Sequence, residues 1–147
     1  MRKYLNPFRL TTLLLLLYCA GHTLGALVST PRFGVASDAV MAAMKSVHFN
    51  ANGSDCTWFG VYMGFGYEVS IFLLFSSALT WFLGGMSTPD QRRWAPITWA
   101  LFVSYAATAV LAVMYFFAVA IVFSSLITVL LGIKGIRLTR GPRATQS

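Results

Sequence analysis

Four long apolar stretches, separated by short polar or charged segments, dominate the chain. Crossing the hydrocarbon core of a bilayer takes about 20 mainly apolar residues in a helix. The pattern predicts spans at residues 11–29, 59–83, 95–114 and 117–133, the last two joined by a tight turn near 115–118. It therefore predicts an all-α fold, a four-helix transmembrane bundle that forms one integral membrane domain over residues 1–147.

The segment between the first two predicted spans holds a shorter helical pattern at residues 37–49. Ser37 suits an N-cap and Asp38 suits the first turn of a helix. Apolar residues then recur at helical spacing at Val40, Met44 and Val47, and Gly53 breaks the pattern. We expect a short extracytoplasmic helix, which either lies on the membrane surface or covers a cavity as a lid.

Composition supports a membrane protein. Of the 147 residues, 57% are hydrophobic and only 10% are charged, where a soluble domain carries about a quarter. The mean hydropathy is +0.70. These values exclude a disordered chain, which needs few apolar residues and many charges, and they argue against a soluble domain.

The basic residues predict the direction of the spans. The net charge is +7, but the eleven basic residues cluster at the ends of apolar stretches, so they do not indicate nucleic-acid binding. Nine fall on one side of the predicted membrane: Arg2, Lys3, Arg9, Arg92, Arg93, Lys134, Arg137, Arg140 and Arg143. Arg32 and Lys45 fall on the other side. The positive-inside rule then places both termini in the cytoplasm.

Two questions about the first span stay open in the sequence. Basic residues followed by a leucine run resemble a secretory signal peptide. Cleavage after Ala20 or Ala26 would place Tyr18 or Leu24 where a small residue is needed, so we expect an uncleaved span. Cys19 in this span could pair with Cys56 in the following loop, although no Cys-x-x-Cys motif is present.

Small residues recur every fourth position in the predicted spans, a spacing that places them on nearly one face of a helix. Membrane helices associate through such faces, where backbones approach closely. The expected packing residues are Gly21, Gly25, Gly60, Gly64, Ser104, Thr108, Ser124 and Thr128. This pattern is common in membrane helices and does not indicate a specific function.

Two ionisable residues fall inside the predicted spans, and they are the strongest candidates for function. His22 in the first span and Glu68 in the second each lie roughly 10–15 Å from the outer end, at about 1.5 Å per residue. A charge at mid-span costs about 2.5–3.5 kcal/mol on insertion scales and usually faces the bundle interior. Glu68 continues the stripe of Gly60 and Gly64, so we expect it to face a helix or a cavity. The candidate intramembrane polar site comprises His22, Glu68, Tyr18, Tyr62 and Tyr67.

This site has three interpretations. The residues could tie the first two spans together by hydrogen bonds worth about 0.6–2 kcal/mol. They could line a polar pocket for a lipophilic ligand, with walls from Trp58, Phe59, Tyr62, Phe65 and Tyr67. Alternatively, Glu68 or His22 could carry a proton in transport or catalysis. His48 lies in the outer loop, so no second histidine supports haem ligation within the spans.

Two short stretches carry a resemblance to a family. Gly-His-Thr-Leu-Gly at residues 21–25 and Trp-Phe-Gly-Val-Tyr-Met-Gly-Phe-Gly at residues 58–66 resemble stretches of a family of small four-span bacterial integral membrane proteins. The motif within the second stretch is Tyr-x-Gly-Phe-Gly, at residues 62–66. The matching positions are Gly21, His22, Thr23, Gly25, Tyr62, Gly64, Phe65 and Gly66. The resemblance implies a four-helix bundle in the bacterial inner membrane, and it implies no activity.

The sequence thus favours a non-enzymatic membrane protein that binds a lipophilic small molecule or a membrane-protein partner within the lipid bilayer. One alternative is a proton-coupled small transporter that uses the Glu68 and His22 pair. The other is an enzyme that modifies a lipid or quinone, with these residues as acid and base. We expect no metal and no cofactor, because no nucleotide-binding loop, nucleophile motif or zinc signature occurs.

Overall fold

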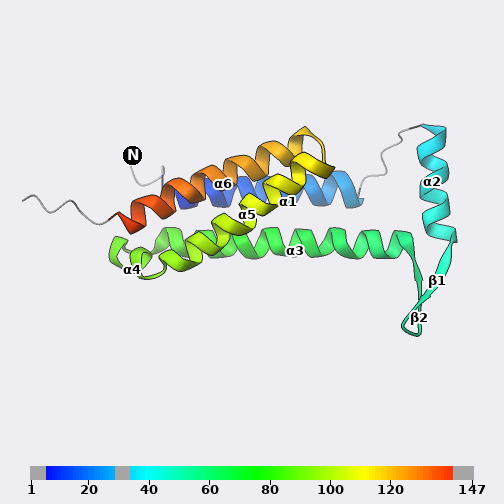
Figure 1. Cartoon of the computed structure of the whole chain (residues 1–147), viewed down its shortest axis with the longest axis horizontal. Coiled ribbons are helices and arrows are strands. Elements are labelled where there is room, and N and C mark those ends of the chain that lie inside the picture. Colours follow the sequence, from blue (N-terminus) through cyan, green and yellow to red (C-terminus); the bar gives the residue numbers. More distant parts are fainter. Residues whose placement is uncertain (1–5, 29–33, 141–147) are drawn as a thin grey trace, which may run out of the picture. The chain divides into compact units, whose positions relative to one another are not determined.

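A computed structural model of the protein describes residues 6–28 and 34–140 (Figure 1). Its elements, in chain order, are α1 (Pro7–His22), the π-helical segment η2 (Thr23–Val28), α2 (Val35–Ser46), β1 (His48–Ala51), β2 (Ser54–Thr57), α3 (Trp58–Gly85), α4 (Thr88–Arg93), α5 (Ala95–Tyr115) and α6 (Ala118–Thr139). The chain divides into two compact units. Unit 1 holds described residues 6–18 and 74–140, and unit 2 holds 19–28 and 34–73. Helices α1 and α3 contribute to both units.

Four helical stretches are long and apolar enough to cross a membrane. They are Pro7–Val28, Trp58–Gly85, Ala95–Tyr115 and Ala118–Thr139. Large apolar side chains such as Ile71, Val103 and Val113 are exposed on these helices, an arrangement that lipid favours and water does not. The prediction of an all-α, multi-pass membrane protein with four spanning helices is confirmed.

Some helices extend beyond the predicted spans, because polar residues continue the helix. Helix α1 begins at Pro7, because the Asn6 side chain accepts a hydrogen bond from the Phe8 N–H (3.1 Å) and proline suits the first position. The turn between α5 and α6 falls at residues 116–117, inside the predicted range.

The C-terminal end requires a correction. The sequence suggested that the last span ends at residue 133, but α6 continues to Thr139. Basic side chains can stay helical while their heads reach toward water. Hydropathy therefore marks the end of the apolar stretch and not the end of the helix. Residues 141–147 lie outside the described part of the chain.

Unit 1 is a helical bundle in which α5 and α6 run side by side (Figure 1). At one end of this unit, α1 begins, α3 and α6 end, and α4 lies against α5 and α6. The contacts there include Asn6 Nδ2 donating to the Gly84 carbonyl (3.1 Å) and Gln91 Nε2 donating to the Leu83 and Met86 carbonyls (3.0 Å each). We call it the basic end, after Arg9, Arg92, Arg93, Lys134 and Arg137.

Helix α6 packs by accepting aromatic rings at its glycines. A Cβ built on Gly132 would lie 3.0 Å from the Phe102 ring, and one built on Gly135 would lie 3.0 Å from the Trp99 ring. Both rings come from α5 and meet edge to face, with centroids 5.3 Å apart. Glycine thus permits the close approach of α5 and α6, as expected for membrane helices.

The predicted small-residue stripes of α5 and α6 are buried to different extents. Ser124 is fully buried and Thr128 is half-buried on α6. On α5 the buried residues are Ala95, Thr98, Leu101, Tyr105 and Ala112, whereas Thr108 is half-buried and Ser104 is exposed. Ser104 and Thr108 donate to carbonyls one turn earlier in α5, at 3.0 and 2.9 Å. Their hydroxyls are satisfied within the helix, so they do not require a neighbouring helix.

No described residue of another helix packs against the predicted packing glycines of the first two spans. A Cβ built on Gly21, Gly25 or Gly64 meets no atom within 4 Å, and one on Gly60 meets only Thr57 of the preceding turn. The close approach in this part of α3 occurs at Gly66, where a Cβ would overlap the Leu27 side chain. The four-residue spacing identified helices that are rich in glycine, but it did not identify Gly66 as the glycine at the close contact.

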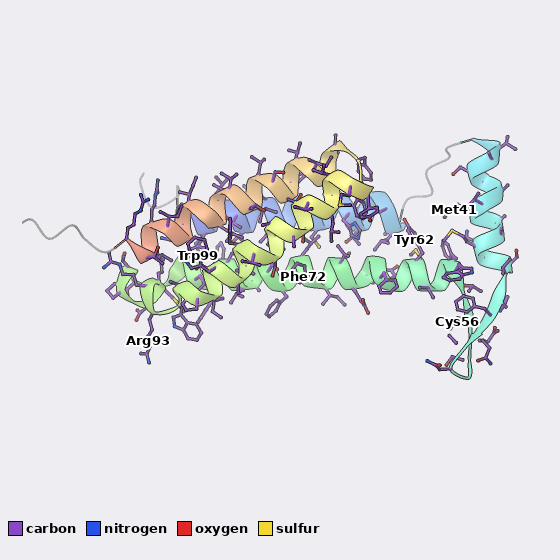
Figure 2. The ribbon with its side chains drawn as sticks, in the orientation of Figure 1. Met41, Cys56, Tyr62, Phe72, Arg93 and Trp99 are labelled. Atoms are coloured by element: carbon purple, nitrogen blue, oxygen red, sulfur yellow. The ribbon has the colours of Figure 1, made fainter. Side chains whose placement is uncertain are left out.

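Residues 34–57 of unit 2 contain a β-hairpin that the sequence analysis missed. Helix α2 starts at Val35, after Gly34 (φ 101°), and ends at Ser46, so the predicted N-cap at Ser37 and end at residue 49 are wrong. Strands β1 and β2 pair antiparallel, closed by a turn in which Asn52 (φ 52°) and Gly53 (φ 90°) are left-handed. Asn-Gly is a strong signal for such a two-residue hairpin turn. Figure 2 marks Met41 on α2 and Cys56 on β2.

Candidate functional site

His22 lies at the end of α1 and is bonded to the backbone of α3. Its Nε2 is 3.0 Å from the Gly66 carbonyl oxygen. Because a carbonyl only accepts, Nε2 carries a proton and donates this hydrogen bond. His22 is half-buried within unit 2.

Three further side chains extend this contact along the two helices. Thr23 Oγ1 and Ser70 Oγ are 2.9 Å apart, Ser70 Oγ donates to the Gly66 carbonyl (3.3 Å), and Cys19 Sγ donates to the Ser70 carbonyl (3.6 Å). We call Cys19, His22, Thr23, Gly66 and Ser70 the polar cluster. Cys19 and Cys56 are both free thiols, so the pairing that the sequence left open does not form.

The π-helical segment η2 begins directly after His22 and shapes one side of this cluster. A π-helix bonds residues five apart, where an α-helix bonds residues four apart. On an α-helix, the side chains of residues 22 and 27 would point in directions about 140° apart around the helix axis. In the structure, however, both His22 and Leu27 contact Gly66. The wider turn thus presents an imidazole and an apolar side chain to the same glycine. Such segments occur frequently at functional sites.

Glu68 lies on the opposite face of α3. It follows Gly66 by two positions and precedes Ser70 by two, a separation of about 200° around the helix. It is exposed, and no described residue donates to its carboxylate or pairs with it. The expected partnership with His22 therefore does not form within the described residues, and the face that we expected to meet a helix or cavity is uncovered.

The described residues show no hydrogen bond between the three tyrosines of the predicted site and the polar cluster. Tyr18 belongs to unit 1, where it stacks on Phe123 with ring centroids 5.3 Å apart. Tyr62 and Tyr67 are exposed on α3, and the ring centroids of Tyr62 and Phe59 are 6.5 Å apart; Figure 2 labels Tyr62. Positions 62 and 67 fall about 120° and 100° from Glu68 around α3, so neither tyrosine shares the face of Glu68.

The hairpin carries an ion pair that the sequence analysis missed. His48 Nδ1 lies 2.9 and 3.1 Å from the two Asp55 oxygens, and both side chains are exposed. His48 pairs in register with Thr57, so Asp55 is its diagonal neighbour on the next strand. Recognising the Asn52-Gly53 turn would have predicted this pairing.

Contacts with residues 45–57 fix the start of α3. Thr57 Oγ1 accepts from the Gly60 N–H (3.0 Å) and caps the helix. Trp58 stacks on Phe49 of β1 at 4.6 Å, and the Lys45 ammonium lies 4.7 Å from the Phe59 ring. Aromatic and cation–π contacts therefore pack residues 45–57 onto the first turn of α3.

The polar cluster consists of hydrogen bonds that join α1 and η2 to α3. Among residues 6–28 and 34–140, no three His, Cys, Asp or Glu side chains gather where they could hold a metal ion. Comparison of the chain with protein-family models, with curated proteins and with solved structures found no match. The function must therefore be inferred from the two faces of α3, one bonded to α1 and the other presenting Glu68.

Proposed function

We propose that the protein is a non-enzymatic binding protein of the bacterial inner membrane, and that its partner is a membrane-spanning helix of another protein that docks on α3 around Glu68. The unpaired Glu68 carboxylate on an exposed apolar face carries this proposal. The distribution of basic residues supports cytoplasmic termini. The resemblance of residues 21–25 and 62–66 to small four-span proteins supports the inner membrane.

Charge and shape both favour a partner on this face. Glu68 is the eleventh residue of α3, about 15 Å from its start, where a lone carboxylate facing lipid is costly. Around it lie Phe65, Ile71 and Phe75, which are 65%, 65% and 63% exposed. Gly64 is next to Glu68 on this face and leaves open space for another backbone. A helix with a basic or hydrogen-bond-donating side chain at the same depth would satisfy Glu68 and fill that space.

A second copy of the chain fits this face less well. The basic residues on the described spanning helices, Arg9, Lys134 and Arg137, lie at the basic end of unit 1. Copies inserted in the same direction and packed around Glu68 would bring two carboxylates together, and like charges repel. A different chain that supplies a cation avoids this cost.

The other interpretations have less support. The aromatic residues expected to wall a ligand pocket, Trp58, Tyr62, Phe65 and Tyr67, are between 46% and 65% exposed, so they form an outer surface. A proton relay from Glu68 to His22 would have to cross α3, because the two residues lie on opposite faces. Neither a lipophilic pocket nor a proton pathway is therefore favoured over a docking face.

The test is site-specific photo-crosslinking in native membranes, with the crosslinker at Phe65 or Ile71 and a control crosslinker at Val103 on α5. We expect one defined protein to crosslink at the α3 positions and not at Val103, and Glu68→Gln to reduce that product about tenfold. The partner should carry a basic or donor side chain at the crosslinked depth. Exchanging the charges, with Glu68→Lys and the matching acidic change in the partner, should restore the product.

Several outcomes would overturn the proposal. One is a crosslinked dimer of the protein itself, and another is a product that survives Glu68→Gln unchanged. A third is equal labelling of α3 and Val103 by many proteins, which would mean that the α3 face contacts lipid and random neighbours.

A further inference from the structure

Arg9 occupies an unusual position at the basic end of unit 1. Its guanidinium carbon lies 3.5 Å from the centre of the Trp81 ring, over the last turns of α3. Gly84 and Gly85 lie beside it: a Cβ on Gly84 would be in van der Waals contact with Arg9 Cδ and Nε (3.4 Å each), and one on Gly85 with Nη2 (3.5 Å). The arginine side chain thus packs along the end of α3.

The hydrogen-bonding capacity of this arginine is unused within the described residues. Nη1 is buried, and no described acceptor reaches it. The four acidic residues of the chain are Asp38, Asp55, Glu68 and Asp90. None forms an ion pair with Arg9, because the one ion pair among the described residues joins His48 and Asp55. The Arg9 side chain as a whole is half-buried and lines a cleft, so an external anion is expected to bind through its accessible N–H groups.

A cleft of about 290 Å³ lies beside the guanidinium and is lined by Arg9, Trp81, Phe82, Gly85 and Met86. Apart from Arg9, its walls are apolar or backbone. Trp81 and Phe82 are 60% and 62% exposed and continue the outer surface of α3. A ligand that fits has an anionic group at one end and an apolar body that can lie along the two rings.

We propose that this cleft is a binding site for an individual anionic phospholipid. The phosphate accepts hydrogen bonds from the Arg9 guanidinium, whose fork of N–H donors matches phosphate oxygens. An acyl chain lies along Trp81 and Phe82. Trp81 also holds the guanidinium in place by the cation–π contact.

The lining of the cleft favours a phospholipid over free phosphate as the ligand. A soluble phosphate would leave Trp81, Phe82 and Met86 without a partner, whereas a phospholipid covers them with its acyl chain. The site is on α1 and the end of α3, in unit 1, and Glu68 is in unit 2. The lipid site therefore stands or falls independently of the partner proposed for Glu68.

The experiment is native mass spectrometry of the full-length protein taken from nanodiscs that contain equal amounts of phosphatidylglycerol and phosphatidylcholine. We expect the wild type to retain phosphatidylglycerol about tenfold over phosphatidylcholine and Arg9→Gln to bring the ratio near one. Arg93→Gln is the matched control, because Arg93 projects away from α4 and does not line the cleft (Figure 2). It should keep the wild-type ratio. Trp81→Leu should lower the ratio about threefold by removing the ring that holds Arg9.

Equal ratios for Arg9→Gln and Arg93→Gln would overturn the site. If Arg9→Gln does not fold, Arg9→Lys keeps the charge but lacks the fork. A ratio for Arg9→Lys at the full wild-type value would then contradict specific recognition of phosphate by arginine. Inorganic phosphate titrated into lipid-free protein in neutral detergent separates the two sources. Arg9-dependent binding of phosphate at micromolar concentration would overturn the lipid assignment.

Discussion

Two pairs of glycines show how differently the same residue is used in this protein. Gly132 and Gly135 on α6 each receive an aromatic ring of α5, with 3.0 Å to the position of an added Cβ. Gly60 and Gly64 on α3 have no other helix against them, and the space beside Gly64 is open. Glycine costs about 1 kcal/mol relative to alanine in a helix interior. Close packing against α5 offsets this cost at Gly132 and Gly135, whereas no described residue of another helix offsets it at Gly60 and Gly64.

The difference separates positions that hold the fold from positions available for binding. The filled glycines belong to a face with a buried Ser124, whereas the open ones continue into exposed Glu68. A stripe of small residues therefore does not by itself indicate internal packing. The predictions below compare covered positions with uncovered ones.

The largest effect is expected at a filled glycine. Gly135→Ala places a methyl group against the Trp99 ring and should reduce stability by about 1–3 kcal/mol, the usual cost of overpacking. The matched control is Gly64→Ala, which enters open space and should leave stability unchanged or raise it by up to about 1 kcal/mol, because alanine is the better helix former. Thermal unfolding of both variants in one detergent measures the contrast. Equal losses would mean that the Gly64 face is packed after all.

The polar cluster should give the next largest effect. His22→Ala removes the hydrogen bond to Gly66 and should cost about 0.6–2 kcal/mol. Ser104→Ala removes an exposed hydroxyl that bonds only within α5, so its cost should be within about 0.5 kcal/mol. Unfolding midpoints of the two variants decide this. A loss for Ser104→Ala as large as for His22→Ala would contradict the importance of the bond between the helices.

A double-mutant cycle tests the separation of the two faces of α3. Because His22 and Glu68 share no contact, the costs of His22→Ala and Glu68→Ala should add to within about 0.5 kcal/mol. As a positive control, His22→Ala and Ser70→Ala should not add, because both side chains bond the Gly66 carbonyl. A coupling above 1 kcal/mol between His22 and Glu68 would show that they interact in the membrane.

The smallest effect is expected in the hairpin. The pair of His48 and Asp55 is exposed to solvent, and exposed ion pairs contribute about 0–1 kcal/mol. Asp55→Asn should therefore leave the unfolding midpoint nearly unchanged, and so should the control Asp38→Asn on α2. Protection of the β1 and β2 amides from hydrogen exchange should fall for Asp55→Asn alone. If protection is equal in the two variants, the pair does not stabilise the hairpin.

The sequence predicted most of the fold because long apolar stretches determine where helices can lie in a membrane. The turn at residues 116–117 followed from length alone. The hairpin was missed because Gly53 was interpreted only as a helix breaker, although the preceding Asn52 makes the pair a hairpin signal. The α6 extension was missed because Lys134 and Arg137 ended the apolar pattern without ending the helix.

One of the three interpretations of the candidate site has its residues join the first two spans by hydrogen bonds. In the structure the partner of His22 is the Gly66 backbone carbonyl, and any residue of α3 could have supplied one. Periodicity alone shows that Gly66 and Glu68 are on different faces, but it does not show which face meets α1. Cys19, Thr23 and Ser70 were missed because small polar side chains are common in membrane helices and carry no distinctive spacing.

The π-helical segment has a consequence for how α1 tolerates changes in length. A wide turn holds one more residue than an α-helical turn, so residues before and after Thr23–Val28 are out of phase by about one position. Deleting one residue there would restore α-helical phase and remove either His22 or Leu27 from Gly66. Deleting one residue earlier, among the leucines, would instead rotate everything before it by about 100°. The segment is thus the place where the length of α1 can change while its N-terminal half keeps its alignment.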